Sequence, residues 1–129
     1  MSQRHILLID DEDDIREVAT ISLQAIGDWR VSSATGGSEG IAMARAERPN
    51  VVLLDVMMPD IDGPATLQRL QADPQTRGIP VIFLTAKAQS ADRRRFARLG
   101  VGGVLIKPFD PLTLSDQITA ILAEEAITP

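Results

Sequence analysis

Short apolar runs alternate with longer amphipathic segments along the chain. The runs are rich in β-branched residues, and they lie at His5–Asp10, Arg30–Ser33, Val51–Asp55, Pro80–Thr85 and Val104–Lys107. Runs of this length and composition are typical of buried strands, and the segments between them have helical length and period. The pattern therefore predicts five strands that alternate with five helices.

The ends of the expected helices carry suitable capping and breaking residues. Acids, serine or proline mark the starts, and glycine or proline marks the ends. The starts are Asp13 and Asp14, Ser38, Pro64 and Ser90, and the ends are Gly27, Pro49 and Leu99 before Gly100.

Residues at helical spacing indicate which helix faces are buried. They are Ile15, Val18, Ala19, Ser22 and Ile26 in the first helix, Leu67 and Leu70 in the third, and Leu114, Ile118, Ile121 and Leu122 in the fifth. Strands that are apolar on both faces, joined by crossover helices, imply a parallel sheet covered on both sides. The predicted fold is a doubly wound, five-stranded α/β domain.

Length and composition narrow the class of protein. The chain has 129 residues and 14.0 kDa, which we interpret as a single domain over residues 1–129 with a core at about 4–125 and no output domain. It has no cysteine, which excludes disulfides and thiolate metal sites. The apolar runs are far shorter than the roughly 20 residues that cross a bilayer, and no signal-peptide pattern precedes them. We therefore expect a cytoplasmic protein.

Charge is unevenly distributed along the chain. Thirteen basic and eighteen acidic residues give a net charge of -5, which argues against direct nucleic-acid binding. Five consecutive acids run from Asp10 to Asp14, and four arginines crowd the expected fourth helix at Arg93, Arg94, Arg95 and Arg98. The two lysines are Lys87 and Lys107.

Polar residues follow four of the apolar strands. Asp10 and Asp11 end the first, Asp55 the third, Thr85 the fourth and Lys107 the fifth. In an open parallel sheet, ligands bind beyond the carboxyl ends of the strands. Neighbouring strands lie about 4.8 Å apart, and like charges about 4 Å apart repel by roughly 4 kcal/mol at an effective dielectric of 20. We therefore expect a cation here: Lys107 together with Mg²⁺, which prefers oxygen ligands.

Each residue alone has a simpler explanation. Asp13 and Asp14 are better read as the start of a helix, and Asp11 by itself fits the same role. Thr85 is an ordinary strand residue. Asp55 is the exception, because a carboxylate at the end of a buried strand is costly without a function. The four strand ends taken together favour a site that accepts a phosphoryl group.

These segments together resemble the response regulator receiver domain, the phosphorylatable module of two-component signalling. The likeness covers nearly the whole chain, and its motifs are Ile6–Asp11, Leu53–Gly63, Phe83–Ala86 and Lys107–Phe109. It implies the flavodoxin-like strand order 2-1-3-4-5 of chemotaxis receivers. It also implies Asp55 as the phosphoacceptor, supplied by a phosphohistidine on a histidine kinase or a phosphotransfer protein.

The resemblance assigns roles to the other residues. Asp11, Asp55 and the backbone carbonyl of Met57 would bind Mg²⁺, with Asp10 acting mainly through a water. Thr85 and Lys107 would contact the phosphoryl group, and the Lys107–Pro108 peptide bond would be cis. Phosphoryl transfer asks mainly for alignment and charge neutralisation.

The resemblance also sets the expected output. The protein would catalyse only its own phosphorylation and dephosphorylation, so it would not be an enzyme acting on other substrates. Phosphorylation would switch the surface around the fourth helix, the fifth strand and the fifth helix, and so control an unknown downstream protein. No direct contact with nucleic acid or membrane is expected.

The chain departs from the family pattern at several positions. Val104 replaces an aromatic residue that usually couples to the threonine, and Gly102–Gly103 replaces a pair of acids found in regulators that dimerise. Lys87 falls where side chains affect the lifetime of the phosphoryl group, although it also fits an exposed charge. Arg94 and Arg98 fit either a solvated helix face or a surface for an acidic partner.

Other interpretations fit less well. The acids after the first strand would repel a flavin phosphate. An aspartyl phosphohydrolase needs an acid where Met57 stands. A calcium loop at Asp60–Gly63 lacks its first and twelfth ligands, since Met58 and Arg69 hold those positions. A receiver-like adaptor that no longer needs phosphate stays open because of Val104. Trp29 and His5 are expected to be structural.

Overall fold

The computed structural model describes residues 3–86 and 89–127. It contains one parallel sheet with helices on both faces. The strands are β1 (His5–Ile9), β2 (Arg30–Ala34), β3 (Val51–Asp55), β4 (Val81–Thr85) and β5 (Gly103–Ile106). The helices are α1 (Asp13–Gly27), α2 (Gly37–Glu47), α3 (Gly63–Ala72), α4 (Ser90–Arg98) and α5 (Leu114–Ile127). The predicted strands are confirmed, each to within one residue at either end.

The strand order is β2-β1-β3-β4-β5, as predicted. All four pairings are parallel, and the register aligns Ile9 with Leu54, Asp55 with Leu84, and Thr85 with Ile106. The carboxyl ends of β1, β3, β4 and β5 therefore lie at one edge of the sheet. This alignment brings the polar strand ends together.

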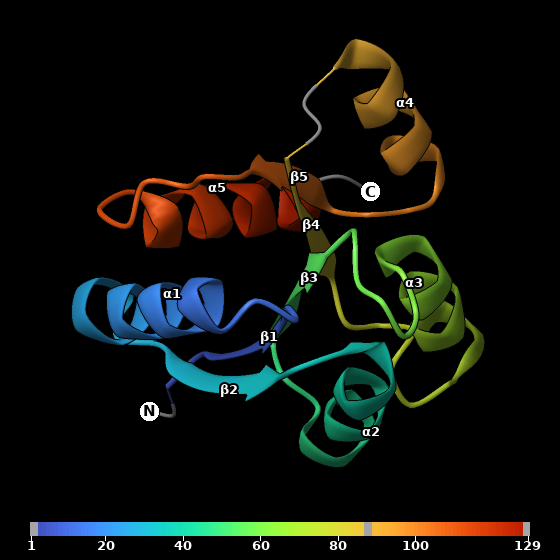
Figure 1. The fold of residues 1–129 in the computed structure, drawn as a ribbon, viewed down its shortest axis with the longest axis horizontal. Coiled ribbons are helices and arrows are strands. Elements are labelled where there is room, and N and C mark those ends of the chain that lie inside the picture. Colours follow the sequence, from blue (N-terminus) through green and yellow to red (C-terminus); the bar gives the residue numbers. More distant parts are fainter. Residues whose placement is uncertain (1–2, 87–88, 128–129) are drawn as a thin grey trace.

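Alternate residues of each strand face opposite layers, because successive side chains point to opposite sides of a strand. Ile6 and Leu8 pack with one core cluster, which includes Ala19 of α1 and Ile118 of α5. Leu7 and Ile9 pack with the other cluster. Figure 1 shows α1 and α5 on one face of the sheet and α2, α3 and α4 on the other. The doubly wound architecture is thus confirmed.

Two of the predicted helix starts are wrong in detail. The residue before α1 is Glu12, whose side chain makes no capping bond, and Asp13 and Asp14 lie in the first turn. Their carboxylates therefore act on the helix dipole and do not cap. Gly36, and not Ser38, precedes α2.

A carboxylate from another segment caps α2. The two oxygens of Asp60 accept hydrogen bonds from the backbone N–H groups of Gly37, at 3.2 Å, and Ser38, at 3.1 Å. These bonds hold the pKa of Asp60 below its ordinary value, chiefly through the Ser38 N–H. By contrast, Pro64 lies in the first turn of α3, as predicted, and Asp62 caps that helix through the N–H of Ala65.

The buried face of α1 differs from the prediction. Ala19 and Ser22 are buried as expected, together with Leu23, but Val18 and Ile26 are 43% and 48% exposed. The sheet and α5 cover only one side of α1, so its second apolar stripe faces outward. In the first turn, Ile15 is partly buried.

Most of the remaining core predictions are confirmed. Leu67 and Leu70 of α3 and Leu114 and Ile118 of α5 are buried, while Ile121 and Leu122 are partly buried. Trp29 is also buried, and its indole N–H donates to Ser115 Oγ at 3.0 Å. His5 begins β1 and contacts Ser32, as a structural residue would. In the part of the chain described, no helix has the length and apolar character needed to cross a membrane.

Candidate functional site

Backbone hydrogen bonds extend the sheet by one residue at its carboxyl edge. The N–H of Asp10 donates to Ala34 O at 3.2 Å, that of Val56 to Leu84 O at 3.1 Å, and that of Lys107 to Thr85 O at 2.8 Å. These bonds fix the backbone on which the polar side chains stand. The site is therefore held by the sheet itself and not by a flexible loop.

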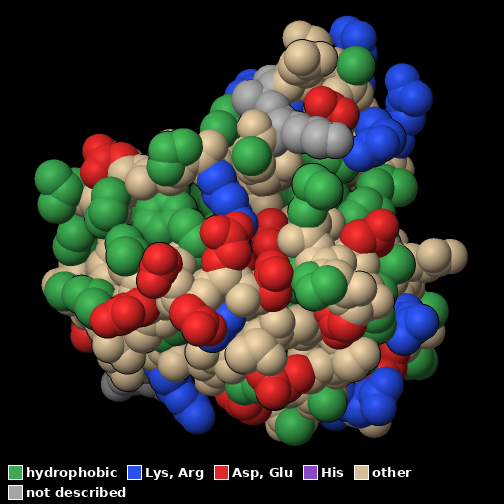
Figure 2. Space-filling view, in the orientation of Figure 1, with side chains coloured by type: hydrophobic (Ala, Val, Ile, Leu, Met, Phe, Trp, Pro, Cys, Tyr) green, Lys and Arg blue, Asp and Glu red, His purple; other side chains and the backbone are tan. Residues whose placement is uncertain are grey.

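Three carboxylates converge at this edge. One oxygen from each of Asp10, Asp11 and Asp55 lies within 4.8 Å of the others. Asp10 is fully buried, Asp55 is 3% exposed and Asp11 is exposed. Two acids thus line the floor of the cluster, and the third lies on its solvent side. Figure 2 shows acidic side chains gathered over the centre of this face.

Lys107 supplies the positive charge of the cluster. Its Nζ lies 3.0 Å from Asp10 Oδ2 and 3.2 Å from Asp55 Oδ1. It also donates to Glu12 Oε1 at 2.9 Å. The Lys107–Pro108 bond is cis, as expected. The partnership with Glu12 was not predicted, because a run of five acids does not indicate which member turns toward the lysine.

Thr85 completes the set at the end of β4. It is 2% exposed and pairs with Ile106 across the sheet. Since Asp55 pairs with Leu84, Thr85 lies one step beyond that pair on the neighbouring strand. The structure therefore brings together all the side chains of the predicted site: Asp10, Asp11, Asp55, Thr85 and Lys107.

Burial and mutual repulsion perturb the carboxylates. Burial raises the pKa of Asp55 to about 6, the charge of Asp10 adds to the rise, and Lys107 opposes it. Burial likewise raises the pKa of Asp10, partly offset by the hydrogen bond from the Glu12 N–H. Both shifts mean that this pocket disfavours two bare negative charges.

Lys107 responds in the opposite sense. Burial alone would lower its pKa, but the hydrogen bonds to Glu12 and Asp10 outweigh burial, and the charges of Asp10 and Asp55 add to them. The pKa of Lys107 is therefore raised, and the side chain stays charged. One lysine faces two buried carboxylates, which leaves an excess of negative charge.

The donor set fits a hard divalent cation. All three converging ligand atoms are carboxylate oxygens, which Mg²⁺ prefers. Asp55 Oδ1 accepts from the N–H of Met57 at 3.4 Å, whereas its buried Oδ2 has no hydrogen-bond partner among the described residues. A buried carboxylate oxygen without a partner is costly, and a cation would satisfy it. The metal role of the Met57 carbonyl stays a prediction.

The start of α3 packs against the backbone that carries Asp55. The N–H of Gly63 donates to Val56 O at 2.7 Å. A methyl group on Gly63 would lie 2.7 Å from Val56 Cα and 2.8 Å from Asp55 O. Only glycine allows α3 to begin this close to Asp55.

Lys87, also singled out in the sequence, lies outside the described residues.

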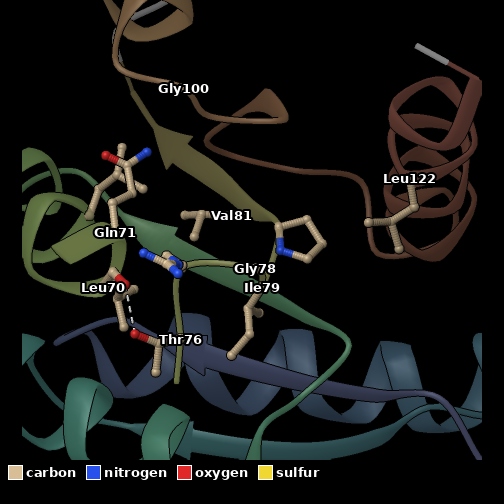
Figure 3. Close-up of a pocket in the computed structure, with 11 residues that line it drawn as sticks. Leu70, Gln71, Thr76, Gly78, Ile79, Val81, Gly100 and Leu122 are labelled. Atoms are coloured by element: carbon tan, nitrogen blue, oxygen red, sulfur yellow. Dashed lines mark hydrogen bonds between the residues drawn. The ribbon is translucent and has the colours of Figure 1, made fainter. Parts of the chain in front are cut away.

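A separate hollow lies at the opposite edge of the sheet. It has a volume of about 430 Å³, and Leu70, Gln71, Thr76, Ile79 and Val81 are among the residues that line it. In Figure 3 the labelled side chains surround the start of β4 and the hydrogen bond from Thr76 to Leu70 O. It shares no residue with the acidic cluster, which lies at the carboxyl edge of the sheet.

Comparisons with known proteins agree with this geometry. The family model for the response regulator receiver domain matches residues 6–119. The chain is 39% identical to Protein PilH of Pseudomonas aeruginosa over 92% of this chain and 97% of that protein. It is 36% identical to Response regulator Rre1 of Synechocystis over 93% of this chain and 52% of that protein. The chain thus spans about half the length of several curated relatives.

Solved structures show the same fold. The chemotaxis response regulator CheY4 of Vibrio cholerae superposes with a TM-score of 0.87 at 28% identity, covering 93% of this chain and 99% of that one. A putative response regulator from Chloroflexus aurantiacus gives a TM-score of 0.86 at 28% identity, covering 95% of this chain and 99% of that one.

Proposed function

The chain belongs to the response regulator receiver domain family of two-component signalling, and from this we propose that Asp55 accepts a phosphoryl group from a phosphohistidine. The observation that carries the proposal is the acidic cluster with Lys107 at the aligned strand ends. An oxygen of Asp55 forms a bond to phosphorus as the phosphorus–nitrogen bond breaks, and the imidazole of the donor leaves. Later attack by water regenerates Asp55 and releases inorganic phosphate.

Charge neutralisation explains the composition of the pocket. Asp10, Asp11, Asp55 and the carbonyl of Met57 would hold Mg²⁺, directly or through water. When bound, the ion offsets the negative charge that builds up on the phosphoryl oxygens. Lys107 is already within 3.2 Å of Asp55 and can pair with the same oxygens. The hydroxyl of Thr85 would donate a hydrogen bond to a phosphoryl oxygen.

An apolar patch beside the pocket suits the protein that delivers the phosphoryl group. Val18, Ile21 and Leu112 are 43%, 59% and 72% exposed. Ser22 of α1 donates to Pro111 O, which joins this helix to the loop before α5. Figure 2 shows hydrophobic side chains gathered over these elements. We place the docking site of a histidine kinase or phosphotransfer protein here, because α1 begins at the acidic cluster.

We further propose that phosphorylation acts on the surface of α4, β5 and α5. Since Val104 takes the usual aromatic position, the switch runs through the backbone and α4. On this proposal the protein catalyses only its own phosphorylation and dephosphorylation, acts in the cytoplasm, and controls a protein without touching nucleic acid. A phosphate-independent adaptor is the competing function.

Intact-mass measurement separates these functions. With Mg²⁺ and a small phosphodonor, the wild type is expected to gain one labile phosphoryl group, and Asp55→Asn none. Asp116→Asn, the same change at an exposed position of α5, should behave as the wild type. A wild type that gains no phosphoryl group favours the adaptor, whereas steady turnover of unrelated phosphoesters favours a hydrolase.

A second experiment tests the donor surface. Ile21→Glu places a charge in the apolar patch without touching the pocket. It should slow phosphoryl transfer from a phosphorylated phosphotransfer protein by about tenfold or more, the effect of losing roughly 1.4 kcal/mol of docking energy. Phosphorylation by the small donor should stay unchanged. Equal slowing with both donors would mean that the substitution disturbs the pocket and that the patch is not the docking site.

A further inference from the structure

The composition of α4 sets it apart from the rest of the molecule. Its nine residues include four arginines and one aspartate, while the whole chain has a net charge of -5. Phe96 is the buried residue of the helix, and its ring packs edge-on against Phe83 with centroids 5.0 Å apart. Figure 2 shows basic side chains gathered over α4. One aromatic anchor thus holds a strongly basic helix that is otherwise exposed.

A groove separates α4 from the loop between β3 and α3. Its volume is about 740 Å³, within the range of ligand-binding clefts. Val56, Met57, Pro59 and Pro64 line the first wall, and Arg95 and Leu99 line the α4 wall. Met57 is 66% exposed and Leu99 is 37% exposed, so both present large apolar side chains to solvent.

Charge complementarity indicates what fits this groove. The guanidinium of Arg95 lies over the Phe96 ring at 5.0 Å and forms no ion pair within the described parts of the chain. Arg94 and Arg98, at helical spacing on the same helix, are both exposed. Asp62, the acid at the rim, is engaged in capping α3. The groove therefore offers an apolar floor under an unmatched positive charge.

The absence of stacking surfaces favours a peptide over a nucleotide. The chain has one tryptophan, three phenylalanines and no tyrosine. Trp29, Phe83 and Phe96 are buried, and Phe109 packs against the core cluster of α1 and α5. None of them lines the groove, so the groove lacks the aromatic side chains on which bases commonly stack in proteins that bind single-stranded nucleic acid. Methionine-lined surfaces, in contrast, adapt to the side chains of peptides.

We propose that this groove binds an acidic, apolar segment of the downstream protein. Leucine-like side chains of that segment fill the space between Met57 and Leu99, and its carboxylates pair with the arginines of α4. The proposal deepens the proposed function and rests on it for one point, that this partner is the protein which reads phosphorylation.

The groove is connected to the phosphoacceptor through the backbone. Met57 lines the groove, and its N–H donates to Asp55 Oδ1 at 3.4 Å. We expect a phosphoryl group on Asp55 to alter this contact. Binding in the groove and phosphorylation of Asp55 are therefore linked, and linkage is reciprocal for the two affinities.

Selection from a random-peptide phage library tests the chemistry of the occupant. The target is the full chain with Mg²⁺ and beryllofluoride, and selected peptides are then bound to protein labelled with ¹³C at the methionine methyls. Enriched peptides should combine Asp or Glu with large apolar residues and shift the Met57 signal. Met43, on α2, should not shift. Enrichment of basic or neutral peptides, a shift confined to Met43, or no enrichment at all would overturn the proposal.

Charge reversal supplies the matched control. Arg95→Glu should weaken binding of the selected peptides by about tenfold or more, and Arg95→Gln by less. Both substitutions remove the ion pair with a peptide carboxylate, but only Arg95→Glu adds a repulsion. Arg77→Glu makes the same change beside the hollow at the other edge of the sheet and should leave affinity unchanged. Equal losses in the Arg95 and Arg77 variants would show a net-charge effect and reject the groove.

The same samples distinguish the two proposals. Intact mass with the small phosphodonor reports whether Asp55 is phosphorylated in each variant. If the wild type is phosphorylated normally but binds no peptide at Met57, the proposal for the groove is overturned and the proposed function stands. A wild type that binds acidic peptides at Met57 but gains no phosphoryl group overturns the proposed function and leaves an adaptor that uses this groove.

Discussion

Unequal numbers of charges shape the site at the scale of single residues. Lys107 lies within 3.2 Å of both Asp10 and Asp55, and it also holds Glu12. One partly buried ammonium cannot neutralise two buried carboxylates. Burial raises the pKa of Asp55 to about 6, and the charge of Asp10 adds to the rise. The pocket therefore gives up folding stability to hold these charges together, as the proposed cation and phosphoryl site requires.

Stability without Mg²⁺ should depend on the charge of Asp55. The pKa of Asp55 in the folded state is above the ordinary value of about 3.9, so the folded protein is favoured when this carboxyl is protonated. The contribution of Asp55 to the free energy of unfolding is therefore fully present below about pH 4, and it is lost as pH rises through about 6. Asn cannot ionise, so Asp55→Asn should be more stable than the wild type at pH 7, by up to about 3 kcal/mol. Urea unfolding measures the difference.

The pH trend of this difference is the decisive observation. The advantage of Asp55→Asn should shrink between pH 7 and pH 4, because the wild-type carboxyl becomes protonated in the folded protein. Asp116→Asn should show no comparable advantage at pH 7. A difference that stays constant across this range would contradict the assignment of the strain to the Asp55 charge.

Close approach between elements positions the site at the next scale. The start of α3 lies against the backbone that follows β3, and Gly63 leaves room for this contact. Likewise, Asp60 of the same loop caps α2. The loop between β3 and α3 thus connects β3, α2 and α3 beside Asp55.

A methyl group at Gly63 should disturb this arrangement. Gly63→Ala would place carbon 2.7 Å from Val56 Cα, so the backbone beside Asp55 must shift. We expect a loss of about 1–3 kcal/mol in the free energy of unfolding, typical of overpacking, together with slower phosphorylation of Asp55 by the small donor. Gly78→Ala is the matched control, because a methyl group there meets no atom within 4 Å. Equal effects of the two substitutions would refute the role of close approach.

At the scale of the whole molecule, the proposed cation site would couple binding to folding. Its acids lie at the ends of β1 and β3, which pair directly in the folded sheet. An ion that binds the folded state alone stabilises it by mass action, by about 2.7 kcal/mol at one hundred times its dissociation constant.

Thermal unfolding should therefore shift upward with added Mg²⁺ at pH 7. The shift should be much smaller in Asp11→Asn, which removes a ligand on the solvent side, and unchanged in Asp116→Asn. Equal stabilisation of all three proteins would indicate a general salt effect and would contradict a site at the acidic cluster.

The order of apolar and polar positions was enough to predict the doubly wound class and the polar cluster at the strand ends, whereas the strand order came from the family resemblance. Buried strands must be apolar on both faces, so their ends are visible in the sequence, and the polar residues after them fall at one edge of a parallel sheet. Asp10, Asp11, Asp55, Thr85 and Lys107 followed from that rule and from the resemblance that their motifs carry.

Contacts between segments distant in the chain were decided only by the tertiary structure. Local propensity favoured Ser38 as the cap of α2, but Asp60 occupies that role from another loop. Helical spacing placed Val18 and Ile26 in the core, yet α5 and the sheet cover only one side of α1. The turn of Glu12 toward Lys107 and the groove beside Arg95 are likewise invisible in the sequence. Periodicity records which face of an element is apolar, whereas its neighbours and the distances between them arise only when the elements pack.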